Sequence, residues 1–379
     1  MASDKNQALM PSIATRVIFF LAGTSVAAWA PLVPYAQDRL RADDALLGFL
    51  LLCLGIGAVG CMPICQRLVA RYGCRAMVYS GAAMICVALP CLATVTNKVA
   101  MGCSLLIFGA GLGFIDVSMN INAIQLEART GRRLMSGFHG FFSVGGITGS
   151  LLGGTLLSIG VHPLGVAGAV VAAVITLVAV FARHIESEGA QAGAKSVLVL
   201  PQGVVVVMSG IALVSFLVEG AMLDWSAVYL TSVKSYDQDR AGFGYTAFSI
   251  AMTIGRLGGD YLVKRLGARS MITGGGVLAV IGLIASILFP TGNQAIFGFA
   301  ITGLGCANIV PVLFAAAGRQ ESMEPTQAIS ALTMLGYGGN LIGPAVVGFF
   351  SHALGLQMAF AILAALLLAA ALAGRRIEG

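Results

Sequence analysis

Acidic and amide side chains interrupt two of the long apolar stretches of this sequence. Asp116 lies four residues before Asn120, and Glu219 lies six residues before Trp225. A charged side chain at bilayer depth costs several kcal/mol unless it faces protein or water, so each such residue is a functional candidate. A carboxylate there can take up a proton or accept hydrogen bonds, and an indole can stack on the apolar face of a sugar. The chemistry indicated is binding and proton transfer inside a membrane.

Asp116 is the candidate for carrying a proton. On a helix of about 3.6 residues per turn, Gly109, Gly113, Asp116 and Asn120 fall on one face. Two glycines beside a carboxylate and an amide predict a polar-lined gap rather than a packing seam, and we expect Asp116 to lie at a central cavity. The alternative is a carboxylate that bonds a neighbouring helix without a part in the mechanism.

Two further apolar stretches, 134–160 and 327–351, each carry a polar stripe opposite a glycine stripe. The glycine stripes suit close contact between helices. Hydrogen bonds between helices would account for the hydroxyls of the polar stripes, but less well for His139, Tyr337 and Asn340. We therefore expect these three residues to line a solute cavity. The polar stripes are Ser136, His139, Ser143 and Ser150 in the first stretch and Ser330, Thr333, Tyr337 and Asn340 in the second.

The stretch 201–231 raises a geometric problem. About 120° separates Glu219 from Trp225 on a regular helix. If both contact one solute, the helix must bend or unwind, and we expect this near Gly220, where the missing Cβ eases distortion. Asp224 is expected near the aqueous boundary, and an interfacial position is the alternative for Trp225.

These stretches belong to a unit that occurs twice in the same direction. A shift of 194 positions lays 135–154 over 329–348, and a shift of 196 superposes Trp29 on Trp225. Parallel repeats in an apolar chain are typical of secondary transporters that rock one half against the other. The residues predicted to bind the solute are Asn120, Glu219, Trp225, His139, Tyr337, Asn340, Trp29 and Asn308.

The composition indicates that most of the surface faces lipid. Hydrophobic residues make up 58% of the 379 residues and charged residues 10%, with a mean hydropathy of +0.92, whereas a soluble domain carries about 25% charged residues. We predict an all-α membrane protein of about twelve transmembrane helices in two parallel six-helix repeats, 12–183 and 201–375, joined by a cytoplasmic linker at 184–200. The apolar stretches are 13–36, 44–66, 76–96, 99–125, 134–160, 163–182, 201–231, 241–263, 270–290, 294–317, 327–351 and 355–374.

Lys and Arg are concentrated in the loops on one side of the predicted membrane. By the positive-inside rule this side is cytoplasmic, and both termini lie there. The net charge of +6 reflects this bias, and no separate basic stretch points to nucleic acid. The N-terminal residues lack the pattern of a cleavable signal peptide, and the lack of an Asn-x-Ser/Thr sequon favours a bacterial protein.

Soluble catalysis is not expected from this sequence. It contains no phosphate-binding loop, cluster of metal ligands or nucleophile arrangement. Cys61 and Cys65 have a spacing that could hold a metal, but no His or carboxylate is near them in sequence, so we interpret them as small buried hydrophobes. We expect neither an enzyme nor a metal or organic cofactor.

Three segments carry a resemblance to a known family. Residues 116–120 (DVSMN) and 219–225 (EGAMLDW) are similar to motifs in the fourth and seventh helices of fucose-permease-like proteins, and 19–23 (FFLAG) is similar to their first helix. The sequence resembles the major facilitator superfamily, in particular its fucose-permease-like branch and bacterial inner-membrane permeases of the YbjJ type. The resemblance implies the major facilitator fold and a monomer driven by the proton gradient. It departs at Ala30, where the sugar permeases have an Asp.

The superfamily's cytoplasmic loop signature is degraded in this sequence. Residues 66–75 lack its Gly and its Asp, and residues 260–269 move the acid to the Gly position. The gate formed by this loop is therefore expected to use other partners. An ion pair between Arg256 and Asp260 within one helix is the simple structural alternative for those two residues. The candidate gating residues are Arg71, Arg75, Arg256, Asp260, Arg265 and Arg269.

The resemblance favours a proton-coupled symporter for a small polar solute, a sugar or sugar derivative. The first alternative is a drug/proton antiporter of the same superfamily, because residues 145–154 resemble the antiporter motif of the fifth helix. That motif has Pro where this chain has Ser150, and the fourth-helix Arg of those antiporters would fall at Leu105. A non-transporting membrane receptor is the remaining alternative.

Overall fold

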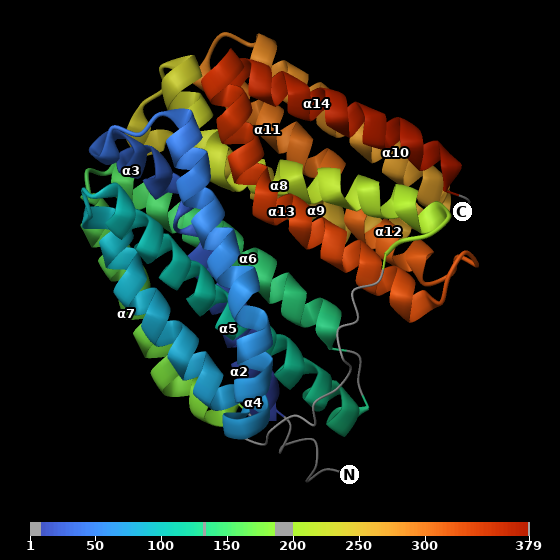
Figure 1. The fold of residues 1–379 in the computed structure, drawn as a ribbon, viewed down its shortest axis with the longest axis horizontal. Coiled ribbons are helices and arrows are strands. Elements are labelled where there is room, and N and C mark those ends of the chain that lie inside the picture. The colour runs from blue at the N-terminus through green and yellow to red at the C-terminus, as the bar shows by residue number, and fades with distance from the viewer. Residues whose placement is uncertain (1–8, 132–133, 186–199, 378–379) are drawn as a thin grey trace. The chain divides into compact units, whose positions relative to one another are not determined.

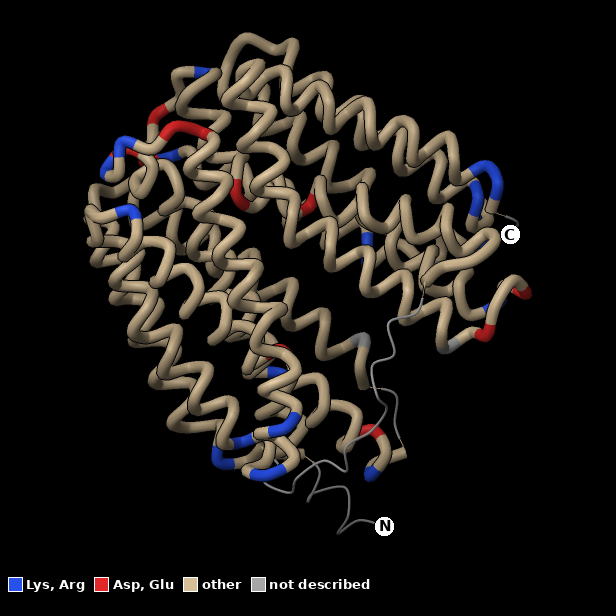
Figure 2. Tube along the Cα trace, in the orientation of Figure 1, with Lys and Arg blue, Asp and Glu red and all other residues tan. Residues whose placement is uncertain are grey.

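The computed structural model describes residues 9–131, 134–185 and 200–377, apart from the side chains of Ser136, Asp260 and Thr326. Every regular element in these residues is a helix (Figure 1). Ten of the described helices are long and apolar enough to cross a membrane. Charged residues gather at helix ends, while only a few lie along the middle of the helices (Figure 2). This distribution is what a lipid environment requires.

The helices follow one another with short connections. The first part of the chain contains α2 (Leu9–Ala27), η1 (Ala30–Leu32), α3 (Val33–Leu40), α4 (Asp44–Thr94), α5 (Lys98–Thr130), α6 (Met135–Ser158), α7 (Pro163–Phe181) and η2 (Ala182–His184). The second part contains α8 (Val204–Lys234), η3 (Gln238–Arg240), α9 (Phe243–Leu257), α10 (Gly259–Leu288), α11 (Gly292–Cys306), α12 (Ile309–Ala317), α13 (Pro325–Leu354), α14 (Leu356–Ala373) and η4 (Gly374–Arg376).

Two of these helices are interrupted at equivalent glycines. Within α4, Gly73 has φ 80° and ψ 165°, and within α10, Gly267 has φ 78° and ψ 160°. A positive φ is readily adopted only by glycine. The 51 residues of α4 therefore contain two of the predicted spans, and the predicted span 241–263 is divided between α9 and the start of α10. The predicted all-α arrangement of two six-helix repeats is confirmed.

The chain forms two compact units. Unit 1 comprises residues 1–41 and 53–195, and unit 2 comprises residues 42–52 and 196–379. The first turns of α4 thus group with the second half of the chain, where Gly48 packs against Gly348 of α13 and Asp44 accepts a hydrogen bond from Ser351. The domain limits predicted above stay a prediction.

Glycine stripes bring helices together within each unit. In unit 1, a Cβ on Gly145 or Gly149 of α6 would collide with a backbone carbonyl of α2. In unit 2, a Cβ on Gly339 of α13 would collide with a carbonyl of α8, whereas one on Gly343 would lie 3.4 Å from the Leu217 oxygen, an ordinary contact. The predicted close helix contacts are confirmed, and the seam is tighter in unit 1.

The same contacts correct the register of the repeat. Gly145 faces Phe20 and its partner Gly339 faces Leu213, which gives α2 and α8 a shift of 193. The shift of 196 that superposes Trp29 on Trp225 is therefore wrong as a description of how α2 and α8 pack on their partner helices. Three residues are less than one helical turn, so two similar residues can appear aligned in sequence although they pack at different depths.

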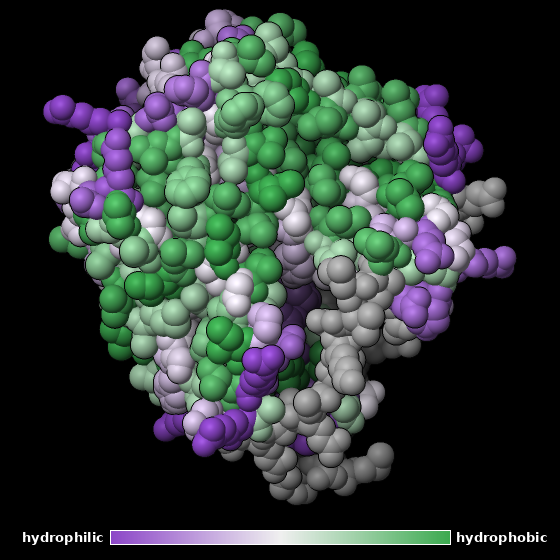
Figure 3. All heavy atoms as spheres, in the orientation of Figure 1, coloured by the Kyte–Doolittle hydropathy of each residue, from purple (hydrophilic) through white to green (hydrophobic). Residues whose placement is uncertain are grey.

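Apolar side chains cover the flanks of the helices, and hydrophilic ones lie near the helix ends (Figure 3). Only 28% of the most apolar window of α4 is buried within the protein. Phe49, Val87 and Ile175 expose 61%, 64% and 56% of their surface. Exposed apolar surface on this scale marks contact with lipid rather than water. The chain is therefore a multi-pass membrane protein.

Candidate functional site

Unit 1 carries its polar site on α5. The side-chain amide of Asn120 donates to the Asp116 backbone oxygen at 2.9 Å and to the Asp116 carboxylate at 3.3 Å. Both residues are half-buried. Among the described residues, no Lys or Arg forms an ion pair with Asp116. The predicted pairing of Asp116 with Asn120 on one helix face is therefore present, and its carboxylate has an amide rather than a cation as its hydrogen-bond donor.

The glycines on this face form a packing seam. A Cβ on Gly109 would collide with the Leu54 carbonyl, and one on Gly113 would lie 2.6 Å from the Cys61 sulfur. The predicted polar-lined gap at these two glycines is therefore wrong, because α4 fills the space that they leave. Cys61 and Cys65 on α4 are buried, as expected.

The remaining predicted residues of unit 1 are spread over α2 and α6. The His139 ring lies edge-on to Phe19, with centroids 5.2 Å apart, and its side chain is exposed. Trp29 is 1% exposed, and its ring nitrogen is buried without a hydrogen-bond partner among the described residues. The structure therefore does not bring Trp29 to an exposed surface. Ser136 lies outside the described side chains.

Two further polar residues of unit 1 are absent from the sequence predictions. The buried Asn122 amide on α5 donates to the Thr15 hydroxyl of α2 at 2.8 Å. The Arg16 guanidinium lies 5.8 Å from the Phe138 ring centroid and 5.9 Å from that of Phe141. Arg16 lies inside the first apolar stretch, so the rule that singled out Asp116 could have found it.

Unit 2 holds an ion pair between α8 and α9. A terminal nitrogen of Arg256 lies 3.5 Å from a Glu219 carboxylate oxygen, with 34% and 16% of the respective side chains exposed. Arg256 Nε also donates to the Ala307 carbonyl at 3.2 Å. The Asp260 side chain lies outside the described residues, so the alternative pair within one helix stays a prediction. Arg256 instead supplies the cation for a carboxylate 37 residues away in sequence.

The break between α11 and α12 fixes the end of α9. Ala307 and Asn308 lie between these two helices. The Asn308 amide donates to the Gly255 carbonyl at 2.9 Å and is 8% exposed. Arg256 Nε donates to the Ala307 carbonyl in return, so two hydrogen bonds join the end of α9 to the residues between α11 and α12. Asn308 therefore positions Arg256 in this structure, which leaves its predicted contact with a solute as a proposal.

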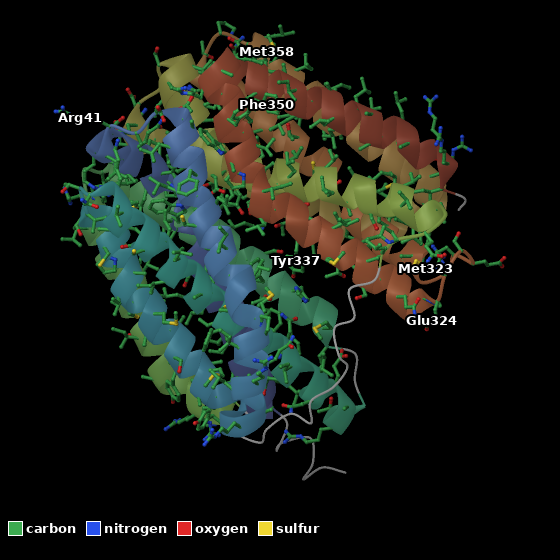
Figure 4. All side chains as sticks on the ribbon, viewed as in Figure 1. Arg41, Met323, Glu324, Tyr337, Phe350 and Met358 are labelled. Atoms are coloured by element: carbon green, nitrogen blue, oxygen red, sulfur yellow. The ribbon has the colours of Figure 1, made fainter. Side chains whose placement is uncertain are left out.

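Gly220 makes room for a neighbour instead of breaking its helix. α8 continues from Val204 to Lys234 without a non-helical residue, so the unwinding expected near Gly220 is wrong. A Cβ on Gly220 would lie 2.7 Å from the Asn340 side-chain oxygen. The missing side chain thus lets Asn340 of α13 approach the backbone of α8 next to Glu219. Tyr337, one turn away on α13 (Figure 4), stacks on Phe216 with centroids 6.0 Å apart.

The outer half of α8 is more buried than predicted. Asp224 is 7% exposed, so its expected position at the aqueous boundary is wrong: the helices packed around α8 cover it. Trp225 is fully buried, with no hydrogen-bond partner for its ring nitrogen among the described residues. Burial excludes the interfacial alternative for Trp225, but it also hides the ring from a solute in this structure.

Tyr245 on α9 is a further polar neighbour. Its ring stacks on Phe248 with centroids 6.2 Å apart, and it lies near Glu219, Arg256 and Asp224. Tyr245, Ser249 and Arg256 share one face of α9 because they are spaced by four and seven residues. That amphipathic spacing is a signal from which the sequence could have identified Tyr245.

The predicted gating arginines differ in how they are held. Arg75 donates to the Ile185 carbonyl through Nε at 3.0 Å and a terminal nitrogen at 2.8 Å. The Arg71 guanidinium lies 5.2 Å from the Tyr72 ring centroid, and that of Arg265 lies 4.5 Å from the Tyr261 ring centroid. Arg75 ties α4 to the end of η2, whereas Arg71 and Arg265 pack on rings of their own helices, α4 and α10. Arg269 is exposed. A gating role for these residues stays a prediction.

Comparison with known proteins identifies the family. The sequence profile described as Major Facilitator Superfamily matches residues 15–296 and, in a second match, residues 207–377. The chain belongs to this superfamily. An uncharacterized MFS-type transporter of Yersinia pestis is 43% identical over 375 residues, which cover 98% of each chain.

Solved structures share the fold of this superfamily member at low identity. A mutant of the nucleoside transporter NupG has a TM-score of 0.77 at 16% identity, covering 97% of this chain and 100% of NupG. A D-xylose-proton symporter has a TM-score of 0.74 at 12% identity, covering 98% of each chain. The predicted major facilitator fold is confirmed.

Proposed function

We propose that this superfamily member takes up a small polar solute, a sugar or sugar derivative, together with protons by alternating access. The observation that carries this proposal is the ion pair between Glu219 and Arg256, at 3.5 Å. The pair is neutral as a whole and offers both hydrogen-bond acceptors and donors, which suits a solute with hydroxyl groups. A D-xylose-proton symporter has the same fold, so that fold accommodates this chemistry.

The ion pair also weighs against the drug/proton antiporter. A cationic drug that bound Glu219 would have to displace Arg256, which has a further hydrogen bond to Ala307 at 3.2 Å. The arginine would then lose its carboxylate inside the membrane, which costs free energy. Because Glu219 is already paired with Arg256, a cationic drug has no free carboxylate to bind at this position, which argues against the antiporter alternative. A non-transporting receptor lacks a specific observation in its favour.

Asp116 is the proposed proton carrier. Its hydrogen-bond donor is the Asn120 amide, and the described residues provide no cation to compensate its charge. A carboxylate in this setting crosses the membrane interior at lower cost as the neutral acid, so loading and release of a proton would accompany transport. Asn120 and Asn340 are the proposed solute contacts nearest to the two carboxylates. Tyr337 and His139 are proposed as more distant contacts.

Three further proposed contacts are buried in this structure, so the helices would have to move before a solute could reach them: Trp225, Trp29 and Asn308.

The proposal extends to the oligomeric state, the membrane and the energy source of the protein. It is a monomer of the fucose-permease-like branch in a bacterial inner membrane, with both termini in the cytoplasm. The proton gradient is its energy source, and no metal or organic cofactor takes part. Arg71, Arg75, Arg265 and Arg269 are the proposed gating residues of the loops, and Arg256 and Asp260 are those of the helical region.

Reconstitution in liposomes tests the function directly. A pH-sensitive dye is enclosed, and candidate sugars, sugar acids, nucleosides and amphipathic amines are added outside after a thermal-shift screen has identified those that stabilise the protein. Internal acidification that depends on the solute supports symport. Solute-dependent proton release from the lumen would instead establish antiport, and binding without flux in either direction would establish a receptor.

A further inference from the structure

At one membrane end of unit 2, a cavity of about 570 Å³ is bounded by the start of α8, the loop between α12 and α13, and the C-terminal turn η4. Two arginines, Arg319 and Arg376, contribute to its wall together with Glu321 and the apolar Val204 and Met208. Neither arginine forms an ion pair with a carboxylate within the described residues. Arg319 Nε donates to the Ala315 carbonyl at 3.2 Å. Two guanidinium groups against one carboxylate give the described wall of the cavity an excess of positive charge.

The wall of this cavity is held by specific hydrogen bonds. Gln320 organises the loop, since its amide donates to the Met323 carbonyl at 2.7 Å and its oxygen accepts from the Ser322 backbone nitrogen at 2.7 Å. The Val204 backbone nitrogen donates to the Ser322 hydroxyl at 3.4 Å, which ties the loop to α8. Gly203 has φ 55°, and a Cβ there would lie 2.6 Å from Ser322. Figure 4 labels Met323 in this loop.

The cavity lies where membrane-spanning helices end. One candidate span begins at Val204, another ends at Ala317, and a third ends at Arg376. All three limits contribute to the cavity or adjoin it. This is the depth at which lipid phosphates lie, and the partly apolar wall at Val204 and Met208 suits the glycerol and upper acyl region of a lipid.

We propose that this cavity binds a phosphate group, with Arg319 and Arg376 as its ligands. Paired guanidinium groups match the oxygens of a phosphate, and their hydrogen bonds with it are charge-assisted. The phosphate belongs either to the headgroup of an anionic phospholipid or to a soluble anion. An occupant would link the start of α8 to the end of α12 and to the C-terminal turn. This site is separate from the Glu219 and Arg256 pair, so it does not depend on the proposed transport activity.

The test uses the full chain in a neutral detergent. Thermal unfolding is followed during titration with short-chain phosphatidylglycerol, short-chain phosphatidylcholine or inorganic phosphate, and apparent affinities are taken from the shift. We expect phosphatidylglycerol to bind at least tenfold more tightly than phosphatidylcholine. If inorganic phosphate stabilises the protein as strongly, the source is a soluble anion. If only phosphatidylglycerol does, the source is the membrane. Equal binding of both lipids and no effect of phosphate would overturn the proposal.

Variants separate this cavity from general surface charge. The double variant Arg319→Gln/Arg376→Gln should weaken binding of the preferred probe at least tenfold. Arg375→Gln removes the neighbouring exposed arginine, which does not line the cavity, and should change the affinity less than twofold. Glu321→Gln removes the opposing charge and should strengthen binding, a gain that a misfolded variant could not produce. An Arg375→Gln effect equal to that of the double variant, or unchanged affinity in Glu321→Gln, would contradict the assignment.

Discussion

Most of each unit comes from one copy of the repeat, but the two units hold a carboxylate of a membrane-spanning helix in opposite ways. In unit 1, Asp116 has an amide of its own helix as its hydrogen-bond donor. In unit 2, Glu219 is paired with a guanidinium on the neighbouring helix. A carboxylate without a cation is suited to gain and lose a proton, whereas a compensated carboxylate can keep its charge and bind a polar solute. The difference suggests a division of labour between coupling and binding.

The packing between helices also differs between the two units. The glycines of α6 press against carbonyls of α2, whereas Gly343 of α13 leaves an ordinary contact distance to α8. The looser end of the seam in unit 2 lies close to Gly220, where the Asn340 side chain enters between the helices. One repeat thus provides a tight seam in unit 1 and an opening for a polar side chain in unit 2.

The largest effect is expected at the uncompensated carboxylate. Asp116→Asn keeps the size and much of the hydrogen bonding of the side chain but cannot bind and release a proton. Proton-driven accumulation of the solute should be lost, while exchange of solute across liposomes without a gradient should persist. Asp237→Asn, which removes an exposed carboxylate between α8 and η3, serves as a control and should retain accumulation. If Asp116→Asn accumulates solute with unchanged pH dependence, the contrast between the units does not concern coupling.

Breaking the ion pair of unit 2 should reduce stability. Arg256→Gln leaves Glu219 without its cation and removes the bond to Ala307. Breaking a fully buried pair costs about 3–5 kcal/mol, and we expect roughly 2–3 kcal/mol here because 34% of the Arg256 side chain is exposed. Unfolding in detergent measures this loss, and the double variant Arg256→Gln/Glu219→Gln should recover part of it. No recovery in that double-mutant cycle would show that the charges are not coupled.

Much of the fold follows from the sequence because the constraint that sets it is local. Apolar length predicts each span, and the interruptions of α4 at Gly73 and of α10 at Gly267 fall in the intervals between predicted spans. The contact between Asp116 and Asn120 also follows from spacing, since residues four apart face each other on any helix.

The errors arise where packing between helices decides the result. Gly109 and Gly113 suggest a gap in isolation, but whether a glycine face stays open depends on whether another helix approaches it, and α4 does so. Asp224 lies near the end of its apolar stretch, so its burial depends on the helices packed around α8. The pairing of Glu219 with Arg256 joins residues on two helices, and no periodicity within one helix predicts such a partner.

The seams provide a matched pair of substitutions. Gly149→Ala forces a methyl group against the Thr24 carbonyl, which belongs to the backbone and cannot move alone, so a loss of about 2 kcal/mol is expected. Its repeat partner Gly343 has 3.4 Å to the Leu217 oxygen, and Gly343→Ala should cost less than about 0.5 kcal/mol. Thermal unfolding of both variants in the same detergent compares them. Equal losses would mean that the two seams are equally tight.

The mildest and most specific test concerns the charge of Glu219. In Glu219→Gln an amide can still accept and donate hydrogen bonds, so a neutral sugar should bind about tenfold more weakly, a loss of about 1.4 kcal/mol. A cationic ligand that depends on the carboxylate should lose nearly all its binding, because its charge would be left without a counterion. Titration of sugars and amphipathic amines on the parent and on this one variant distinguishes the two ligand classes. If amines bind the parent tightly and fail on the variant while no sugar binds either, then Glu219 is a cation site despite Arg256, and the assignment of solute binding to a compensated carboxylate is wrong.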